Sequence, residues 1–399
     1  MTFTDLGLHA ALSERCKQMG YENPTPIQQQ AIPAVLDGND VLACAETGTG
    51  KTAAFLLPIL HKLQKSRNFR GTQVLILSPT RELANQTEAV CKTFLPKGFT
   101  CKAIIGGSGY KHQMEALRKG VNIIIATPGR LIDYMDQGIL DLSQVNTLVL
   151  DEADRMLDMG FLPPIKRIVK AIPAKRQTLF FSATMSKEIE SIAYSMLNDP
   201  EIIEISKRGK AAATIKQTAY PVAQQFKMPL LLNLLETEDY DRVLVFTRTK
   251  RGADRLAHIL EKRDHKSNRI HGDRSQSQRE TALRAFKSGK TNILVATDVA
   301  ARGIDIDSVS HVINYDIPEA PEDYVHRIGR TGRAGNTGNS ITLFTIAEEH
   351  SMKAIEKLTG EKLERIHLPD FGGHVMPEKK PTRSMPRGRR SFGRSGRRR

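Results

Sequence analysis

Short apolar runs rich in β-branched residues alternate with longer helical patterns along almost the whole chain. In the first half the candidate strands span residues 40–45, 73–78, 121–126, 147–150, 178–181 and 201–205. In the second half they span 242–247, 267–270, 292–296, 311–314 and 340–344. Such alternation is typical of βα units around a parallel sheet, whose buried strands are joined by crossover helices. The pattern predicts an α/β fold with two sheets of similar size.

A polar, basic segment at residues 206–217 separates the two groups of strands. Its Ala, Gly and Lys content is typical of an interdomain linker, so we expect one domain at 1–205 and another at 218–369. From residue 370 onward the sequence consists mostly of Gly, Pro, Ser and Arg. Such a segment buries too little apolar surface to offset its ordering entropy, which predicts a disordered basic tail at 370–399.

The net charge of +15 and the isoelectric point of about 9.6 indicate a polyanionic partner. Ten Lys or Arg residues and one acid, Glu378, lie in 371–399, so this segment carries +9 and the first 370 residues carry +6. The tail therefore holds most of the positive excess, and the folded part is only mildly basic.

No apolar run approaches the roughly 20 residues that span a bilayer, and the first residues do not resemble a secretory signal. We therefore expect a cytoplasmic protein that does not associate with membranes. The four cysteines lack C-x-x-C spacing, so any metal is expected to bind carboxylates and phosphates.

The string A-E-T-G-T-G-K-T at 45–52 follows a candidate strand and precedes a helical pattern. Backbone N–H groups of such a Walker A loop cradle phosphates, while Lys51 reaches the β- and γ-phosphates and Thr52 binds Mg²⁺. A second G-K-T at 289–291 has Arg284 where Gly or Ala is required, and it precedes a strand. Only the first half is thus expected to bind nucleotide through this loop. The expected nucleotide contacts are Ala45, Glu46, Thr47, Gly48, Thr49, Gly50, Lys51 and Thr52.

The candidate strand at 147–150 runs directly into Asp151-Glu152-Ala153-Asp154. This places acids at the carboxyl end of a buried strand, where parallel sheets bind ligands. Such a string alone is more often a helix cap, but the strand before it and the upstream Walker A loop favour a catalytic interpretation. We expect Asp151 to hold Mg²⁺ and Glu152 to orient and deprotonate the attacking water.

A glutamine at residue 28, in the string P-T-P-I-Q, can donate to adenine N7 and accept from the adenine N6 amine, which guanine cannot match. Together with the preceding motifs, this order resembles the DEAD-box ATP-dependent RNA helicases over residues 3–345, most closely the bacterial RhlE-like branch. The resemblance implies two tandem RecA-like domains that use ATP and Mg²⁺. It also implies nucleotide contacts from Phe3, Tyr21, Thr25, Gln28 and Asp305.

Loops that follow the candidate strands carry hydroxyls, glycines and arginines. Such groups at one edge of a sheet can grip a sugar-phosphate backbone without reading bases. The resemblance assigns RNA contacts to Pro79, Arg81, Gly106, Gly107, Thr127, Gly129 and Arg130 in the first half. In the second half it assigns them to Arg248, Gly272, Gln276, Arg279, Thr297, Arg302 and Gly303.

The string H-R-I-G-R-T-G-R at 326–333 interleaves arginines with glycines, which suits close approach to phosphate better than an ordinary helix surface. The resemblance makes Arg330 and Arg333 arginine fingers and gives His326, Ser182 and Thr184 roles in coupling hydrolysis to strand separation. Because these arginines lie beyond the linker from Lys51, the hydrolytic site requires the two domains to close on each other.

The function expected from these features is ATP-dependent closure of two domains on RNA, with local unwinding of short duplexes. One alternative is an ATP-gated RNA clamp or a ribonucleoprotein-remodelling subunit that grips without productive unwinding. Another is a DNA-directed relative. A GTPase is disfavoured because the chain has no N/T-K-x-D string. Structured or duplex RNA is the expected partner, together with ribosomal or RNA-degradation complexes.

Overall fold

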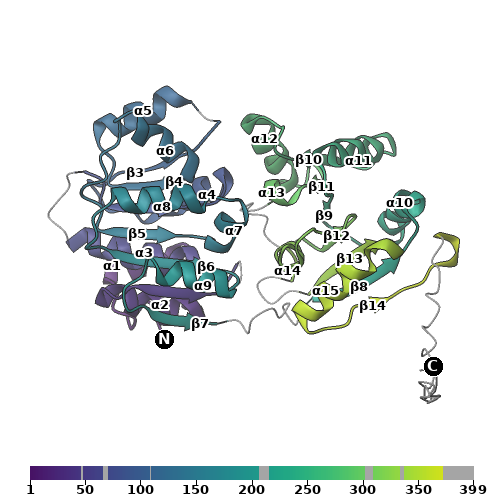
Figure 1. Cartoon of the computed structure of the whole chain (residues 1–399), viewed down its shortest axis with the longest axis horizontal. Coiled ribbons are helices and arrows are strands. Elements are labelled where there is room, and N and C mark those ends of the chain that lie inside the picture. Colours follow the sequence, from purple (N-terminus) through teal and green to yellow (C-terminus); the bar gives the residue numbers. More distant parts are fainter. Residues whose placement is uncertain are drawn as a thin grey trace, which may run out of the picture.

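The computed structural model describes residues 1–45, 48–65, 71–107, 109–205, 215–301, 309–332 and 337–371. These residues form two α/β units that lie side by side, each built on a parallel sheet flanked by helices (Figure 1). The predicted fold class is therefore confirmed. The predicted tail falls outside the described residues from residue 372 onward.

The first unit contains a sheet of seven described strands in the order β3-β4-β2-β5-β6-β1-β7. Its strands are β1 (Val41–Cys44), β2 (Val74–Leu77), β3 (Cys101–Ile104), β4 (Ile123–Ala126), β5 (Thr147–Leu150), β6 (Gln177–Ser182) and β7 (Glu201–Glu204). Its helices are α1 (Ala10–Gln18), α2 (Pro26–Asp37), α3 (Lys51–Lys65), α4 (Arg81–Phe94), α5 (Tyr110–Lys119), α6 (Pro128–Asp136), α7 (Ala153–Asp158), α8 (Leu162–Ala171) and α9 (Lys187–Tyr194).

The second unit contains another sheet of seven described strands, in the order β10-β11-β9-β12-β13-β8-β14. Its strands are β8 (Ile215–Pro221), β9 (Val243–Phe246), β10 (Ser267–Ile270), β11 (Ile293–Ala296), β12 (His311–Asn314), β13 (Gly338–Phe344) and β14 (Glu364–Arg365). Its helices are α10 (Lys227–Thr237), α11 (Lys250–Lys262), α12 (Gln276–Lys287), α13 (Asp298–Ala301), α14 (Pro321–Ile328) and α15 (Glu349–Thr359). Short 3₁₀ turns are η1 (Gln224–Phe226), η2 (Ile346–Glu348) and η3 (Pro369–Phe371).

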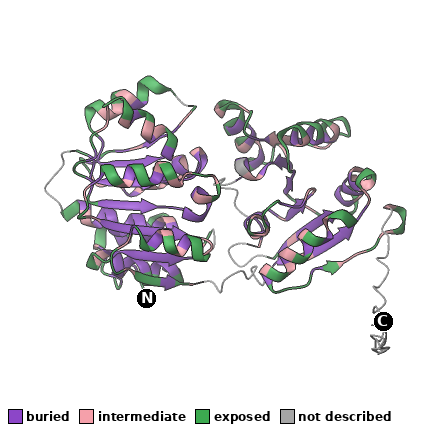
Figure 2. Cartoon of the chain, viewed as in Figure 1, coloured by how far each residue is buried: buried purple, intermediate pink, exposed green. Residues whose placement is uncertain are grey.

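Hydrophobic side chains alternate between the two faces of each sheet, because successive residues of a strand point to opposite sides. On β2, Val74 and Ile76 join one buried cluster, whereas Leu75 and Leu77 join the cluster on the opposite face. Figure 2 shows that most strands are buried, whereas the edge strands β7 and β14 and the outer surfaces of the covering helices are largely exposed. Helices on both faces therefore shield the sheet and leave its strand ends as the accessible edges.

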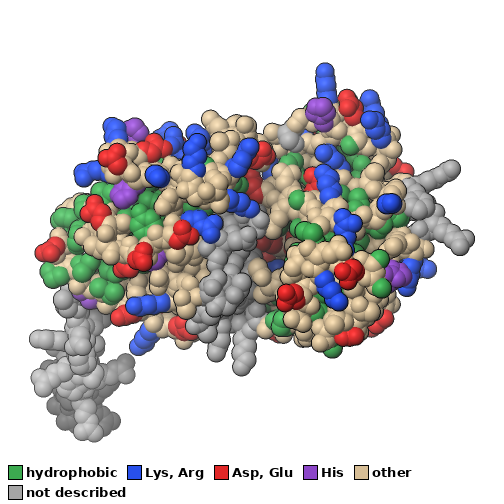
Figure 3. All heavy atoms as spheres, turned by 180° about the vertical axis from the view of Figure 1, so that it is seen from behind, with side chains coloured by type: hydrophobic (Ala, Val, Ile, Leu, Met, Phe, Trp, Pro, Cys, Tyr) green, Lys and Arg blue, Asp and Glu red, His purple; other side chains and the backbone are tan. Residues whose placement is uncertain are grey.

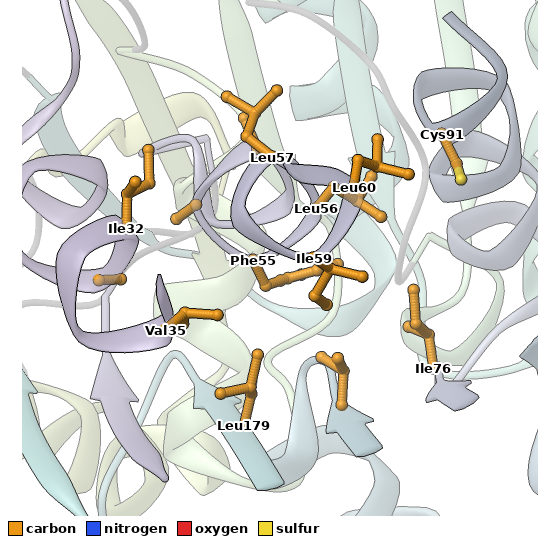
Figure 4. Close-up of a cluster of buried hydrophobic side chains, with 14 of the residues drawn as sticks. Ile32, Val35, Phe55, Leu56, Leu57, Ile59, Leu60, Ile76, Cys91 and Leu179 are labelled. Atoms are coloured by element: carbon orange, nitrogen blue, oxygen red, sulfur yellow. The ribbon is translucent and has the colours of Figure 1, made fainter. Parts of the chain in front are cut away.

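Helix α3 anchors the nucleotide loop to one of these cores. Its apolar face, which includes Phe55 and Ile59, packs toward Val35 of α2 and Leu179 of β6 (Figure 4). The residue that begins α3, Lys51, is thereby held in place by a buried helix rather than by a mobile loop.

Three strands were absent from the sequence prediction. β3, β8 and β14 have mixed composition or only a few residues, so they carry no run of β-branched residues. β8 begins at Ile215, within the segment that composition favours as a linker. Within the described ranges, no helix is both long enough and apolar enough to cross a membrane.

Candidate nucleotide and RNA site

The Walker A segment has the strand, loop and helix order that its sequence predicts. β1 ends at Cys44 and α3 begins at Lys51. Gly48 and Gly50 adopt φ values of 85° and 93°, which side chains other than glycine rarely tolerate. The buried ammonium of Lys51 donates to the carbonyl of Ala45, so it points back across the loop. Glu46 and Thr47 lie outside the described residues.

Gln28 lies directly against the Walker A loop. Its Oε1 accepts from the backbone N–H of Thr25 at 3.0 Å, and its Nε2 donates to the Gly50 carbonyl at 3.1 Å. A Cβ added at Gly50 would collide with this Nε2, so the close approach requires glycine. The glutamine therefore links the start of α2 to the phosphate loop. To bind adenine, its amide would give up its hydrogen bonds to Thr25 and Gly50.

The two aromatic residues assigned to the nucleotide lie in different surroundings. Phe3 exposes only 2% of its surface and packs in the first unit's core. Tyr21 stacks against Phe94 with ring centroids 5.9 Å apart. In this arrangement Phe3 offers no open face to a base.

Asp151 follows β5 and is buried beside the Walker lysine. Burial and the neighbouring Glu152 carboxylate raise the pKa of Asp151 to about 7, although Lys51 opposes the shift. Arg155 pairs with Glu152, whereas Asp151 keeps a raised pKa, so a divalent cation at Asp151 would stabilise its ionised form. Among the described residues, no group of three or more His, Cys, Asp and Glu side chains could hold a metal. Mg²⁺ typically uses one or two carboxylates with substrate phosphates, and the predicted ligands Asp151 and Thr52 would supply one carboxylate and one hydroxyl.

Glu152 is held in one orientation within the same site. It has a φ of 51°, an uncommon left-handed conformation for a residue with a side chain. Its Oε2 accepts from Arg155 Nη1 at 2.8 Å. Burial alone would raise the pKa of Glu152, but Arg155, Lys51 and Arg330 lower it below its usual value. The carboxylate is thus ionised, as a general base requires, and one of the cations responsible comes from the second unit.

Asp154 contacts two of the three residues that were assigned to coupling, Thr184 and His326, and the third, Ser182, bonds to Thr184. Its Oδ2 accepts from the backbone N–H groups of Ala183 at 3.1 Å and Thr184 at 2.9 Å, and from the Thr184 hydroxyl at 3.0 Å. Ser182 Oγ donates to the Thr184 carbonyl at 2.6 Å. His326 Nε2 of the second unit lies 3.7 Å from the same Oδ2.

The pKa of Asp154 agrees with its place as an acceptor of several hydrogen bonds. Burial would raise its pKa, but His326, Lys51 and Arg155 hold the pKa well below the usual range. Asp154 was quoted within its motif but was not among the predicted site residues. Its place in the same four-residue motif as the predicted metal ligand and base was the only available signal, because its partners come from distant segments.

Only some arginines of the 326–333 segment face the first unit. Arg327 is fully buried inside the second unit, where it pairs with Asp298 at 2.6 and 2.7 Å and donates to Asn314 Oδ1 at 3.1 Å. Its guanidinium also lies 4.9 Å from the Phe246 ring centroid. Arg330 instead acts on the Glu152 carboxylate across the boundary. Arg327 is therefore a support for α14, and Arg333 lies outside the described residues.

The RNA loops of the first unit gather at the carboxyl ends of adjacent strands. Arg81 lies over the glycine turn that follows β3, because a Cβ at Gly107 would collide with its guanidinium. Thr127 precedes α6, and Gly129 and Arg130 lie in its first turn. β2 ends at Leu77, the buried Ser78 comes next, and Pro79 follows it. These residues occupy one edge of the sheet, as their sequence positions predict.

Two residues of α12 with predicted roles in RNA binding contact the first unit in this structure. Arg279 Nη2 lies 2.9 Å from Oε2 of Glu82, and Gln276 Nε2 donates to Glu82 Oε1 at 3.4 Å. Glu82, which the sequence analysis did not select, directly follows Arg81 and is buried. Predicted RNA residues of the second unit are thus joined to the neighbour of Arg81, a predicted RNA residue of the first.

The remaining predicted residues of the second unit are dispersed along its strand ends. Arg248 Nη2 pairs with Glu348 at 2.9 Å, Gly272 follows β10, and Thr297 follows β11. Arg302, Gly303 and Asp305 lie outside the described residues. On the face shown in Figure 3, Lys and Arg side chains lie among Asp and Glu over both units. That face carries no single basic patch, in agreement with the mild charge of the folded part.

A P-loop and acidic pair in one unit, completed by basic residues of a second similar unit, define a two-domain nucleotide hydrolase. The model of the DEAD/DEAH box helicase family matches residues 25–192, and the helicase conserved C-terminal domain matches 226–335. The chain therefore belongs to the DEAD-box helicase family.

Similar proteins agree with this assignment. The chain is 45% identical to the ATP-dependent RNA helicase CshA of Listeria monocytogenes, covering 92% of this chain and 71% of the relative. It is 43% identical to the ATP-dependent RNA helicase DeaD of Escherichia coli K12, covering 92% of this chain and 59% of the relative. The structure of S. cerevisiae Dbp5 bound to RNA and ADP BeF3 superposes with a TM-score of 0.84 at 31% identity, covering 92% and 95% of the two chains.

Proposed function

We propose that this protein is an ATP-dependent RNA helicase in which ATP and RNA together close the two units and locally separate short duplexes. The observation that carries the proposal is the contact of residues 151–154 with the second unit, at α14 and the residues that follow it. Asp154 meets His326, and Glu152 lies in the field of Arg330. The CshA and DeaD relatives and the RNA-bound Dbp5 structure support RNA as the partner.

The hydrolytic site uses residues of both units. Lys51 binds the β- and γ-phosphates, while Asp151 and Thr52 would hold Mg²⁺, which would supply neutralising charge to the phosphates. Glu152 orients a water molecule and accepts its proton as the oxygen attacks the γ-phosphorus, giving ADP and phosphate. Arg330, and Arg333 by its place in the motif, stabilise the charge of the transferred group. Since Arg330 comes from the second unit, hydrolysis requires closure.

Binding of the two ligands is coupled because both favour the same closed state. ATP favours closure through Asp154 and Arg330, and RNA favours it by contacting loops of both units. Each ligand therefore raises the affinity for the other by the same factor. Contacts to the sugar-phosphate backbone make recognition independent of sequence.

Finer features of the function rest on the sequence. The arginine-rich segment at 371–399 supports the RhlE-like branch and additional binding to phosphate. Ribosomal or RNA-degradation complexes are the proposed setting, in the cytoplasm. An ATP-gated clamp or remodelling subunit is the alternative, but the intact Glu152 and Arg330 favour turnover.

Strand separation with the full chain tests the proposal. A short RNA duplex with a single-stranded extension, labelled on one strand, is mixed with protein and ATP, ADP or GTP, and a DNA duplex of the same sequence is run in parallel. We expect ATP-dependent release of RNA strands, and none with Glu152→Gln. ATP-dependent RNA binding without strand release would support the clamp instead, and equal release of DNA strands would support the DNA-directed relative.

A further inference from the structure

An exposed aromatic ring lies beside one of the predicted RNA arginines. Tyr110 begins α5 and stacks on Tyr134 of α6 with centroids 5.0 Å apart and an interplanar angle of 26°. Tyr134 is fully buried, and its hydroxyl donates to the Tyr110 carbonyl at 3.2 Å. Tyr110 itself exposes 37% of its surface, and its hydroxyl donates to Gln137. The ring is thus fixed on one face and at its tip.

Arg130 completes this group. Its guanidinium carbon lies 5.7 Å from the Tyr110 ring centroid and 5.8 Å from that of Tyr134. Its Nε lies 3.5 Å from Asp133, whereas its buried Nη1 has no well-aligned hydrogen-bond acceptor among the described residues. An enclosed guanidinium N–H without an acceptor is costly, and a ligand oxygen would satisfy it. A phosphate oxygen suits a guanidinium well.

The group lies on the same edge as the other predicted RNA loops. Tyr110 follows the glycine turn after β3, Arg130 follows β4, and these two strands are paired. Arg81 covers that glycine turn. A single strand held by Arg81 and Arg130 would therefore pass along the Tyr110 ring.

A fixed and partly exposed ring is suited to stacking. Ordering a mobile side chain normally opposes binding, but here Tyr134 and Gln137 have already ordered the ring. A base can stack on it whatever its identity, because every base has a π face. The structural alternative is that Tyr110 only covers Arg130 and the junction of α5 with α6.

We propose that Tyr110 is a stacking residue for one nucleobase of single-stranded RNA, with Arg130 holding the phosphate of that nucleotide. The proposal rests on the proposed RNA function and adds to it a base contact at one position of the strand. It provides affinity without sequence preference, and it fixes which nucleotide lies at the junction of α5 with α6.

Equilibrium binding of single-stranded RNA to full-length variants, with ATP analogue present, tests the proposal. Tyr110→Leu removes the ring and should weaken binding by about tenfold or more, within the range measured for loss of base–aromatic stacking. Tyr110→Phe keeps the ring and should bind within about twofold of wild type, since only the Gln137 hydrogen bond is lost. Tyr194→Leu, at the exposed end of α9, is the control and should bind as wild type does.

A single abasic site moved along the oligonucleotide identifies the stacked base. In the wild-type protein, removing the base at one position should weaken RNA binding by about the same factor as Tyr110→Leu does. In Tyr110→Leu, removing that same base should weaken binding no further. This double-mutant cycle needs no assumption about how the variant folds, because the wild-type scan already tests for a single stacked base. Unfolding midpoints and ATP binding of each variant report structural damage separately.

Any of three results would overturn the stacking role. The first is wild-type RNA affinity in Tyr110→Leu, and the second is an equal loss of affinity in Tyr110→Phe and Tyr110→Leu. The third is an abasic scan of the wild-type protein in which no position weakens binding more than the others. Failure of the wild-type protein to bind any RNA would instead overturn the proposed function itself, so the two failures are distinguishable.

Discussion

The two units meet at two buried acid–base contacts that differ in how they are supported. Beside the nucleotide loop, Asp154 accepts three hydrogen bonds from its own unit before His326 approaches. Beside the predicted RNA loops, Glu82 instead contacts two residues of the second unit, Arg279 and Gln276. The nucleotide-side contact is therefore organised before closure, whereas the RNA-side contact forms only through closure.

This difference separates the chemistry from the coupling. A buried acid that loses its only cation is strongly destabilised, whereas one that keeps several donors is not. The nucleotide-side residues should therefore control the rate of hydrolysis, and the RNA-side pair should control how strongly RNA favours the closed state. Variants at the two contacts are expected to change different measured quantities.

Arg330→Ala should produce the largest effect. Removing an arginine finger typically lowers the hydrolysis rate by about 10³–10⁵. RNA-saturated ATPase of the full chain measures it, and ATP binding should change little because Lys51 and Asp151 remain. Arg263→Ala, at an exposed position after α11, is the control. Wild-type turnover in Arg330→Ala would remove this residue from the hydrolytic site.

The RNA-side pair is tested by reversing its charges. Arg279→Glu places two acids together and should lower the RNA stimulation of ATPase by about 5- to 150-fold, the usual range of a coupling energy. Glu82→Arg combined with Arg279→Glu should recover part of the loss, because the pair regains opposite charges. Arg284→Glu on the exposed face of the same helix should leave stimulation unchanged. If the double variant is no better than Arg279→Glu, the ion pair is not the coupling contact.

These contacts also show where sequence reasoning ends. Runs of Ile, Val and Leu predicted most strands and thereby the strand-end loops, and the Walker A and DEAD strings predicted the nucleotide residues. Composition alone could not separate Arg327 from Arg330, because the burial of Arg327 depends on Asp298 from a different segment. The pairing of Glu82 with Arg279 joins residues 82 and 279 across two units, and no local pattern encodes it. Local periodicity thus predicted the elements, while partner choice required the tertiary structure.

A smaller effect is expected from pH on the nucleotide side. The pKa of Asp151 is raised to about 7 by burial and Glu152, so the carboxyl is largely protonated at pH 6 and ionised at pH 8. A metal ion must displace that proton, so the affinity for ATP with Mg²⁺ should fall about tenfold as pH decreases from 8 to 6. In Asp151→Asn binding should be weaker at both values, with a reduced dependence on pH. The phosphates of ATP titrate equally in both experiments. An identical pH dependence in Asp151→Asn and wild type would therefore show that Asp151 is not the titrating group.

The smallest effect should come from the segment that follows both units. Residues 371–399 carry a net charge of +9 and, after Phe371, a single aromatic residue, Phe392. Phosphate neutralisation must therefore dominate any RNA binding by this segment, and each neutralised phosphate contributes about 0.7 to the log–log salt slope on single strands. Truncation after Asp370 should weaken RNA affinity and flatten its salt dependence equally for all sequences. ATPase at saturating RNA should change little, because every proposed catalytic residue precedes the truncation. Unlike Arg279→Glu, this change leaves the contact between the units intact, so it should lower affinity without lowering the maximal stimulation by RNA. Equal affinity and equal slope in the truncated and full-length proteins would leave the segment without a role in RNA binding.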